Sequence, residues 1–415
     1  MSDVVPQLIL KAGRDRSLRQ GHPWVFSGAV ASVRPPARAG DVVLAVSGDG
    51  RPLGLGFYQP ETDIIFRLLT GRTDEPVDGA FWRRSIRRAM DLRRLVVPPE
   101  TTAYRLIHAE GDGMPGLIVD RYDRILVVSF ATAGMDRRRE EIAAALVEEV
   151  TPDCILERSE GRARRLEGLP DRSGTLFGDV PPGPVEIRER GLRYRVDVVK
   201  GQKTGFFLDQ RENRALLGGL CAGAMVFNGF SFTGGFSVAC GRGGAKRVVS
   251  VDVSEDACGL ARENLAANGI STEDHPVVRA DVFRYLRETE ETYDLVILDP
   301  PAFAKTRRDV ARAARGYKDA NLQALLRLRE GGILATFSCS NAVDEVLFER
   351  IVQGALQDAG RSASVLYRVG AGPDHPVSLG HLEGRYLKGL VLAVRGAAPG
   401  GPSGPAGGRP PASRR

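Results

Sequence analysis

The sequence has few cysteines, few lysines and no long apolar run. Its cysteines, at positions 154, 221, 240, 258 and 339, are odd in number and never spaced as Cys-x-x-Cys, which argues against a disulfide framework and a zinc site. No stretch approaches the roughly eighteen apolar residues that a membrane-spanning helix needs. Residues 1–6 lack the charged and apolar regions of a signal peptide. We therefore expect a cytoplasmic protein without a membrane segment.

Positive charge is present but moderate. The formal net charge is +6, which is compatible with a nucleic-acid partner but too small to establish one. Lysine occurs only at positions 11, 200, 203, 246, 305, 318 and 388, and every other basic side chain is an arginine. Such a bias usually reflects genome composition, so the abundance of arginine is weak support for phosphate binding.

The length of 415 residues predicts two or three domains. Residues 1–73 contain short strand-like runs between Gly, Pro and Asp turns, as at 40–46, 54–58 and 63–69, and predict a small β-barrel. Residues 74–184 predict a compact α+β domain that begins with an arginine-rich helix from Asp78. Residues 397–415 are a Gly/Pro/Ala/Ser-rich tail that we expect to be disordered.

Residues 185–396 form the third predicted domain. From residue 224 to residue 358, apolar strand-like runs alternate with helix-like segments. This alternation predicts an α/β fold with a mostly parallel sheet that is covered by helices on both faces. Ligands of such sheets bind beyond the carboxyl ends of the strands, so the residues that follow each strand are the candidates for function.

A glycine-bearing turn follows the first of these strands. The segment 226–238 passes from a strand through Gly234 and Gly235 into a helix, which lets backbone N–H groups approach a polar ligand. Its spacing does not match the Gly-x-Gly-x-x-Gly dinucleotide fingerprint. The next two strands end in Asp252, suited to the hydroxyls of a ribose, and in Asp281, suited to the edge of an adenine. Carboxylates in such places are also common helix N-caps, which leaves both interpretations open.

Asp299-Pro300-Pro301 follows the strand predicted at 293–298. The two prolines fix the backbone and remove two N–H donors, so a carboxylate and outward carbonyl groups are held rigidly. This arrangement suits a base edge that carries exocyclic N–H donors. The cation-rich run 305–315 comes next and predicts either a solvated helix face or a phosphate contact.

Cys339 lies at the end of the strand predicted at 332–338, between Ser338 and Ser340. Most cysteines at strand ends are inert packing residues. At the edge of an α/β sheet, however, a partly exposed thiolate can act as a nucleophile. We interpret the other four cysteines as packing residues.

Five segments together resemble the class I S-adenosylmethionine-dependent methyltransferases, and more narrowly the ribosomal large-subunit RNA cytosine-C5 methyltransferases with an N-terminal PUA domain. They are Lys203-Thr-Gly-Phe-Phe-Leu-Asp-Gln-Arg211, Phe230-Ser-Phe-Thr-Gly-Gly-Phe-Ser237, Asp299-Pro-Pro-Ala-Phe303, Phe337-Ser-Cys-Ser340 and Glu383-Gly-Arg-Tyr-Leu-Lys388. The likeness covers nearly the whole chain except the tail.

The resemblance implies a PUA-like RNA-binding barrel, a small α+β linker domain and a Rossmann-like catalytic domain. It implies S-adenosylmethionine as cofactor, and the residues expected to bind it are Gln210, Arg211, Phe232, Thr233, Gly234, Gly235, Asp252, Asp281 and Asp299. One departure is Gly229, where the family usually has a bulky aliphatic residue.

The chemistry implied by the resemblance uses two catalytic residues. Carbon 5 of cytosine is a poor nucleophile, so Cys339 would attack C6 and make C5 enamine-like, while Asp299 would hold the N3/N4 edge. The base that removes the C5 proton is not identified. The target must be unpaired or flipped out of a helix, and the barrel and the arginine-rich helix would contact the RNA backbone.

Two other interpretations stay open. An exocyclic-amine methyltransferase would use Asp299-Pro300-Pro301 without the cysteine, although Ala302 rather than an aromatic residue follows the prolines. A ribosome-assembly factor would bind RNA without turnover. The expected partner is large-subunit ribosomal RNA, free or partly assembled, and a homodimer is an open alternative for the oligomeric state.

Overall fold

The computed structural model describes residues 5–201, 204–304 and 306–397. The chain forms two compact units, of which unit 1 contains residues up to Arg211 together with Ala371–Arg385, and unit 2 contains Glu212–Gly370 and the residues from Tyr386 onward. The predicted domain limits at residues 73, 184 and 396 remain our proposal. Almost all of the predicted disordered tail, residues 398–415, lies outside the described residues.

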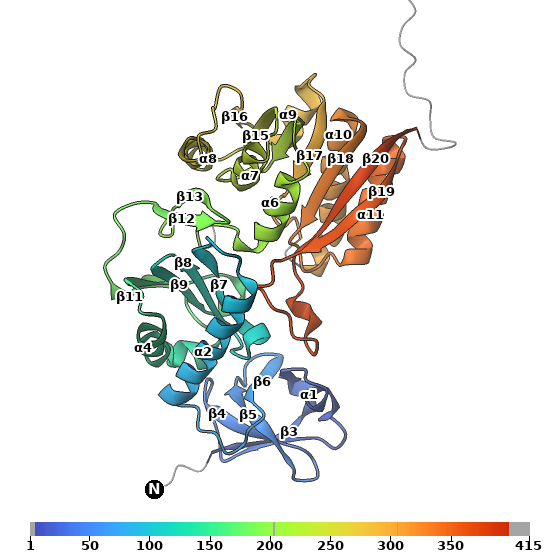
Figure 1. The fold of residues 1–415 in the computed structure, drawn as a ribbon. Coiled ribbons are helices and arrows are strands. Elements are labelled where there is room, and N and C mark those ends of the chain that lie inside the picture. The colour runs from blue at the N-terminus through green and yellow to red at the C-terminus, as the bar shows by residue number, and fades with distance from the viewer. Residues whose placement is uncertain (1–4, 202–203, 305, 398–415) are drawn as a thin grey trace, which may run out of the picture. The chain divides into compact units, whose positions relative to one another are not determined.

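An N-terminal sheet forms the first part of unit 1 (Figure 1), with the strand order β2-β6-β5-β4-β1-β3. The strands are β1 (Gln7–Leu10), β2 (Trp24–Phe26), β3 (Val30–Arg34), β4 (Val42–Val46), β5 (Pro52–Tyr58) and β6 (Ile64–Thr70). All neighbours pair antiparallel except β1 and β4, which are parallel. Leu8, Val43 and Phe66 are completely buried in its core. The strand-like runs at 40–46, 54–58 and 63–69 are confirmed as β4, β5 and β6.

A second sheet of unit 1 has the order β11-β10-β9-β8-β7. Its strands are β7 (Ala103–His108), β8 (Leu117–Tyr122), β9 (Ile125–Phe130), β10 (Cys154–Ser159) and β11 (Arg172–Gly178). Helices α2 (Gly79–Val96) and α4 (Arg139–Val150) share one apolar core with it, in which Trp82, Leu106 and Leu146 are completely buried. The side chain of Asp78 accepts a hydrogen bond of 2.9 Å from the N–H of Phe81 and caps α2, so the predicted helix start is confirmed.

The arginines of α2 are largely occupied by partners within unit 1. Arg83 and Arg87 bond to glutamates of α4, and Arg84 bonds to Glu75. Arg88 donates to the carbonyl of Asp112, Arg93 forms a buried pair with the Asp112 carboxylate, and Arg94 bonds to Asp91. Within the sequence of the helix only Asp91 opposes these cations, so their neutralisation was not visible before folding. Fewer arginines of this helix are therefore available to bind phosphate groups of RNA than we expected.

Segment 371–385 lies between β19 and β20 in the sequence, yet it belongs to unit 1. It packs closely on the turn after β7, because a Cβ atom at Gly111 would lie only 1.9 Å from the carbonyl oxygen of Pro376. The antiparallel hairpin of β12 (Val185–Glu189) and β13 (Leu192–Val196) also belongs to unit 1. The contact between Gly111 and Pro376 joins residues more than 200 positions apart.

Unit 2 is built on a sheet with the order β16-β15-β14-β17-β18-β20-β19 (Figure 1). The strands are β14 (Met225–Gly229), β15 (Arg247–Asp252), β16 (Val277–Arg279), β17 (Tyr293–Leu298), β18 (Leu328–Ser338), β19 (Arg361–Gly370) and β20 (Lys388–Ala397). The pairs from β16 to β18 are parallel, whereas β20 pairs antiparallel with both β18 and β19. The predicted α/β fold with a mostly parallel sheet is confirmed.

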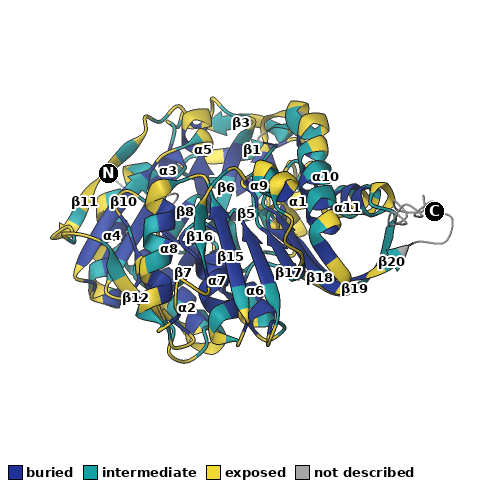
Figure 2. Cartoon of the chain, turned by 90° about the horizontal axis from the view of Figure 1, so that it is seen from above, coloured by how far each residue is buried: buried dark blue, intermediate teal, exposed yellow. Residues whose placement is uncertain are grey.

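Helices cover this sheet. Helices α9 (Val282–Glu288), α10 (Val310–Arg327) and α11 (Glu345–Asp358) share one apolar core with the strands, while α7 (Gly235–Arg242) and α8 (Glu255–Ala267) pack together against β15. Figure 2 shows β15, β17 and β18 as mostly buried strands. Near-continuous apolar runs are typical of strands buried on both faces. Helix α10 begins at Val310, so Arg312 and Arg315 of the cation-rich run lie exposed on it.

The remaining helical elements are short. They are α1 (Arg16–Arg19), α3 (Ala133–Arg137), α5 (Arg162–Leu166), α6 (Arg211–Gly218) and the 3₁₀ turns η1 (Ser27–Ala29), η2 (Ala109–Asp112), η3 (Leu208–Gln210), η4 (Arg307–Asp309) and η5 (Leu382–Gly384). Across the described part of the chain, no helix combines the length and apolar character needed to cross a membrane.

Candidate active site

The glycine-bearing turn lies between β14 and α7 at the carboxyl edge of the unit 2 sheet. Phe230 and Phe232 have φ angles of +59° and +47°, and Gly234 has a φ of +79°. Positive φ is unusual for side chains as large as phenylalanine, so the turn is held in a constrained backbone shape. The helix α7 starts directly after it at Gly235. The predicted strand, turn and helix are thus observed in the expected order.

Asp252 fixes this turn from the end of the neighbouring strand β15. Its Oδ2 accepts a hydrogen bond of 2.9 Å from the N–H of Phe232, and its Oδ1 accepts one of 3.0 Å from the N–H of Ser254. The carboxylate is half-buried, so it still presents part of its surface to a ligand. The structure brings Asp252 and the turn residues together, as expected for a shared cofactor site.

Several buried polar atoms around the turn suit a polar cofactor. Among the described residues, Asn228 Oδ1, Ser231 Oγ and Thr233 Oγ1 are buried and have no hydrogen-bond partner within the protein. Such atoms are normally satisfied, so a ligand with hydrogen-bonding groups would complete them. The amino-acid portion and the ribose of S-adenosylmethionine carry such groups. The donors and acceptors of this chain therefore fit that cofactor.

Asp281 has a structural role that the sequence left open. It is exposed and caps helix α9, because its Oδ1 accepts a hydrogen bond of 2.9 Å from the N–H of Arg284. The cap explains the aspartate by itself, so a contact of Asp281 with an adenine stays a prediction.

Gly229, where the chain departs from the resembling family, lies in a filled part of the core. A Cβ atom there would lie 2.8 Å from Cε1 of Phe227 and 2.9 Å from Cγ1 of Val282. The Phe227 ring and Val282 thus occupy the space that a larger side chain would need. The glycine is explained by this packing rather than by close approach of a ligand.

Asp299 and the two prolines follow β17, which pairs with β18 in parallel. The loop that continues from Pro301 is tied to the end of β18, since the N–H of Ala304 donates to Ser340 Oγ over 3.2 Å. Phe303 is directed into an aromatic cluster, with its ring centroid 4.7 Å from that of Tyr317 and 6.5 Å from that of Phe230. The structure therefore brings the Asp-Pro-Pro loop and the segment of Cys339 together.

Cys339 differs from the other cysteines in exposure. It is half-buried, whereas Cys154, Cys221, Cys240 and Cys258 are buried. Both neighbours of Cys339 bond to one phenol, because the Tyr317 hydroxyl lies 3.0 Å from Ser338 Oγ and 2.9 Å from Ser340 Oγ. This clamp fixes the residues on both sides of the thiol.

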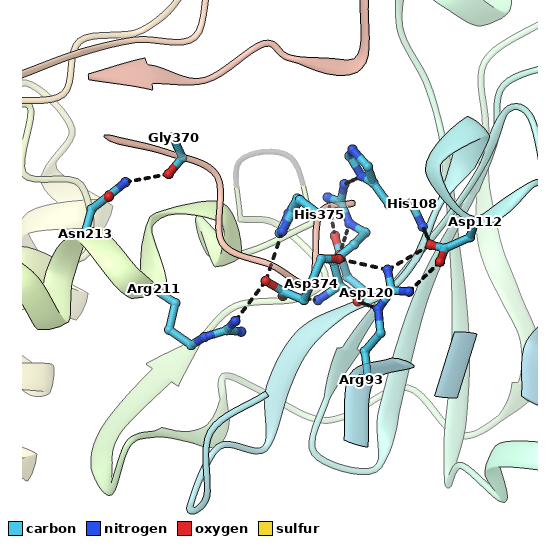
Figure 3. Close-up of polar contacts among 10 residues, drawn as sticks. Arg93, His108, Asp112, Asp120, Arg211, Asn213, Gly370, Asp374 and His375 are labelled. Carbon is cyan, nitrogen blue, oxygen red and sulfur yellow. Dashed lines mark hydrogen bonds and ion pairs between the residues drawn. The ribbon is translucent and has the colours of Figure 1, made fainter. Parts of the chain in front are cut away.

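Gln210 and Arg211 lie in unit 1, where both are buried. Arg211 Nη2 bonds to Asp374 Oδ1 over 2.9 Å (Figure 3). Arg93 donates to the Asp374 carbonyl over 2.8 Å and forms a bidentate ion pair with the Asp112 carboxylate. We call Arg93, Asp112, Arg211 and Asp374 the charge cluster. Arg211 thus has a structural partner, and contact of Gln210 or Arg211 with a cofactor stays a prediction.

Some functional candidates were missed by sequence reasoning. Tyr317 lies in the middle of a helix, and Asp374 and His375 belong to no recognisable motif. The sequence pattern therefore did not indicate that any of these three residues forms key polar contacts. Lys388 was visible only as the end of one family-like segment. Lys203 and Lys305, which begin two of the segments discussed above, lie outside the described residues.

Comparison with known proteins decides the family. A family model described as S-adenosylmethionine-dependent methyltransferase matches residues 104–364, and one described as a PUA-like domain matches residues 8–71. The chain belongs to the S-adenosylmethionine-dependent methyltransferase family. The predicted cofactor and the combination of a PUA-like domain with a Rossmann-like methyltransferase domain are confirmed.

Similar methyltransferases are known from several bacteria. The chain is 42% identical over 392 residues to ribosomal RNA large subunit methyltransferase I of Alteromonas mediterranea, covering 94% of this chain and 98% of that protein. The same-named protein of Aeromonas salmonicida is 41% identical, covering 94% and 99%.

Two solved structures share the fold of this methyltransferase. A protein described as an S-adenosylmethionine-dependent methyltransferase from Streptococcus mutans has a TM-score of 0.79 at 25% identity, covering 94% of this chain and all of that one. A second methyltransferase, crystallised with SAH, has a TM-score of 0.80 at 25% identity, covering 94% of this chain and 100% of that chain.

Proposed function

We propose that this methyltransferase forms 5-methylcytidine in large-subunit ribosomal RNA, in the cytoplasm, through a covalent adduct between Cys339 and C6 of the cytosine. The observation that carries the proposal is the placement of the Cys339 thiol. Within the described chain it is the one cysteine that is not buried, and its segment is hydrogen-bonded to the Asp299-Pro300-Pro301 loop through Ser340 and Ala304. Carbon methylation needs a thiol and a carboxylate at one site, and the link between these two segments supports that arrangement.

The proposed chemistry starts with the thiolate of Cys339. It forms a bond to C6, and the electron pair of the C5–C6 double bond makes C5 nucleophilic, while Asp299 stabilises the protonated N3/N4 edge. S-adenosylmethionine supplies an electrophilic methyl group. A base then takes the C5 proton, and the Cys339–C6 bond breaks to restore the aromatic ring and the thiolate.

The substrate class rests on the relatives. Proteins that are 41–42% identical over more than nine-tenths of this chain are named ribosomal RNA large subunit methyltransferases. The PUA-like sheet and the arginines exposed on α10 would contribute affinity for the RNA backbone. We therefore propose large-subunit ribosomal RNA, with the target base unpaired or flipped out.

Phe303 argues against methylation of an exocyclic amine. An aromatic side chain after the prolines serves amine methylation when its ring can face the base. Here the ring of Phe303 packs among Tyr317, Phe230 and Phe283 instead. The carbon-methylation proposal does not need such a ring.

The direct test is the Cys339→Ala variant, assayed with S-adenosylmethionine and ribosomal RNA from a strain that lacks the enzyme. We expect its turnover to fall by about 10³-fold or more, because the nucleophile is lost. Wild-type protein should form a stable covalent complex with RNA that contains 5-fluorocytidine. In this nucleobase a fluorine replaces the C5 proton, which the general base must remove before the Cys339–C6 bond can break. Nucleoside mass spectrometry should identify the product as 5-methylcytidine.

Cys154→Ala is the matched control, since this thiol is buried in unit 1. It should keep turnover and product unchanged. Normal methylation by Cys339→Ala, or an N4-methylated product, would refute the covalent mechanism. Calorimetry in which the wild-type protein does not bind S-adenosylmethionine at near-millimolar concentration would instead favour an RNA-binding assembly factor.

A further inference from the structure

Lys388 is a buried cation beside the segment that carries Cys339. It is the first residue of β20, and the antiparallel register places it directly opposite Ser338 of β18. The residue is only 6% exposed. The ammonium group donates to the carbonyl oxygen of Ser340 over 2.7 Å and to that of Val343. Lys388 thereby holds the chain on the carboxyl side of Cys339.

A buried ammonium group is unfavourable unless nearby groups compensate its charge. Two carbonyl oxygens satisfy hydrogen bonds of Lys388 but carry no net charge. The titratable groups that act on it are Cys339, Glu345 and Asp344, all of which favour its charged form. Burial lowers the pKa of Lys388, and a negative charge on Cys339 is the largest effect that opposes this shift. The carbonyl that Lys388 binds belongs to Ser340, the residue next to Cys339, so the ammonium group lies close enough for the lysine and a Cys339 thiolate to favour each other's charged forms.

A neutral side chain also holds this segment. Tyr317 bonds to the hydroxyls of Ser338 and Ser340, and its ring packs on Phe303 and Phe348. Burial raises the pKa of Tyr317, so this phenol stays protonated and supplies no charge. Lys388 is thus a cation placed to favour the thiolate.

We propose that Lys388 is a positioning residue for the reaction of Cys339: it fixes the segment 339–343 through two carbonyl groups and provides the positive charge that keeps the thiol ionised. The proposal rests on the proposed role of Cys339 as nucleophile. The thiolate is the reactive form of a cysteine, so loss of this charge slows every reaction in which the Cys339 sulfur attacks an electrophile.

The test measures the thiol itself and needs neither RNA nor cofactor. Full-length protein is treated with iodoacetamide between pH 5 and 10, and alkylation of the Cys339 peptide is followed by mass spectrometry; the four buried cysteines serve as internal references for unfolding. In Lys388→Met we expect the midpoint of the pH profile to rise by about one unit and the rate at pH 7 to fall about tenfold.

Two further variants keep the proposal testable if Lys388→Met folds poorly. Glu345→Gln removes an exposed negative charge that competes for Lys388, so the Cys339 midpoint should fall by a few tenths of a unit. Lys318→Met is the matched control, because this lysine pairs with Asp358 at the surface over 2.8 Å, and its profile should equal that of the wild type. In methylation assays Lys388→Met should lower kcat with little change in KM.

The outcomes separate the two proposals. An alkylation profile of Lys388→Met that matches the wild type, or a Glu345→Gln midpoint that rises, would overturn the role of Lys388 while leaving Cys339 as nucleophile. Normal methylation by Cys339→Ala would overturn the proposed function, whatever the alkylation profile shows. A wild-type midpoint lowered from the ordinary thiol value of about 8.5, together with the shift in Lys388→Met, would support both.

Discussion

The charge cluster of unit 1 and the Cys339 segment of unit 2 are both polar groups within apolar surroundings, but they are built differently. In the charge cluster, Arg93, Asp112, Arg211 and Asp374 are at most 9% exposed, and each charge has a partner of opposite sign. Around Cys339 the hydrogen bonds come mainly from neutral serines, a tyrosine and carbonyl groups, and the thiol is half-buried. Complete charge pairing serves stability, whereas an accessible thiol near a cation serves reactivity.

The comparison implies that the two regions fail in different ways. A change in the charge cluster should mainly lower the free energy of unfolding, because it leaves a buried charge without its partner. A change at Cys339 should mainly lower activity. Variants of each kind should be measured for both stability and turnover. A charge-cluster variant that loses mainly activity, or a Cys339 variant that loses mainly stability, would contradict this division.

Asp374→Ala should give the largest loss of stability. It removes the partner of Arg211 and the acceptor of the Arg105 N–H, which donates to Asp374 Oδ2 over 2.9 Å. We expect the free energy of unfolding in denaturant titrations to fall by about 3–5 kcal/mol, the usual effect of breaking a buried ion pair. Asp153→Ala, which breaks an exposed pair with Arg124, is the control and should change nothing measurable. A small effect of Asp374→Ala would mean that the cluster is not the stabilising element that we describe.

Acid should weaken the same interaction. Burial alone would raise the pKa of Asp374, but the His375 imidazole 3.2 Å away, the charge of Arg211 and the N–H of Arg105 outweigh it and hold the pKa well below its usual range. A carboxyl whose pKa is lower in the folded state contributes stability above its unfolded value of about 4 and loses it as the pH falls below that value. The difference in melting temperature between the wild type and Asp374→Asn should therefore be largest near pH 6 and shrink toward pH 3. A constant difference would contradict this linkage.

The sequence predicted the centre of unit 2 well, because local patterns determine it. The apolar runs and their polar ends placed β14, β15, β17 and β18 correctly, and with them Asp252, Asp299 and Cys339 at one edge of the sheet. Parallel strands buried on both faces have a composition that single-sequence reasoning can detect.

Long-range contacts were not predictable in the same way. Residues 371–385 are assigned to unit 1 because of contacts such as the hydrogen bond from Arg93 to the carbonyl of Asp374. These two residues are 281 positions apart in the sequence. Neutralisation of the α2 arginines likewise depends on Glu148 and Glu149 of another helix. The strands β19 and β20 were not predicted. The apolar run Leu390–Val394 lies within β20, but its antiparallel pairing with β18 and β19 follows from tertiary packing. Charge pairing between distant segments leaves no periodic pattern.

Asp281 has the smallest expected effect, and its variants test whether the residue only caps helix α9 or also binds the cofactor. As a cap of α9, its replacement by alanine should lower the free energy of unfolding by about 1 kcal/mol, while Asp281→Ser should retain most of the cap through its hydroxyl group. If Asp281 also accepts a hydrogen bond from the adenine, both variants should bind S-adenosylmethionine several-fold more weakly by calorimetry. Unchanged affinity in the serine variant would assign Asp281 to the helix alone, and the cofactor would then depend on Asp252 and the glycine-bearing turn.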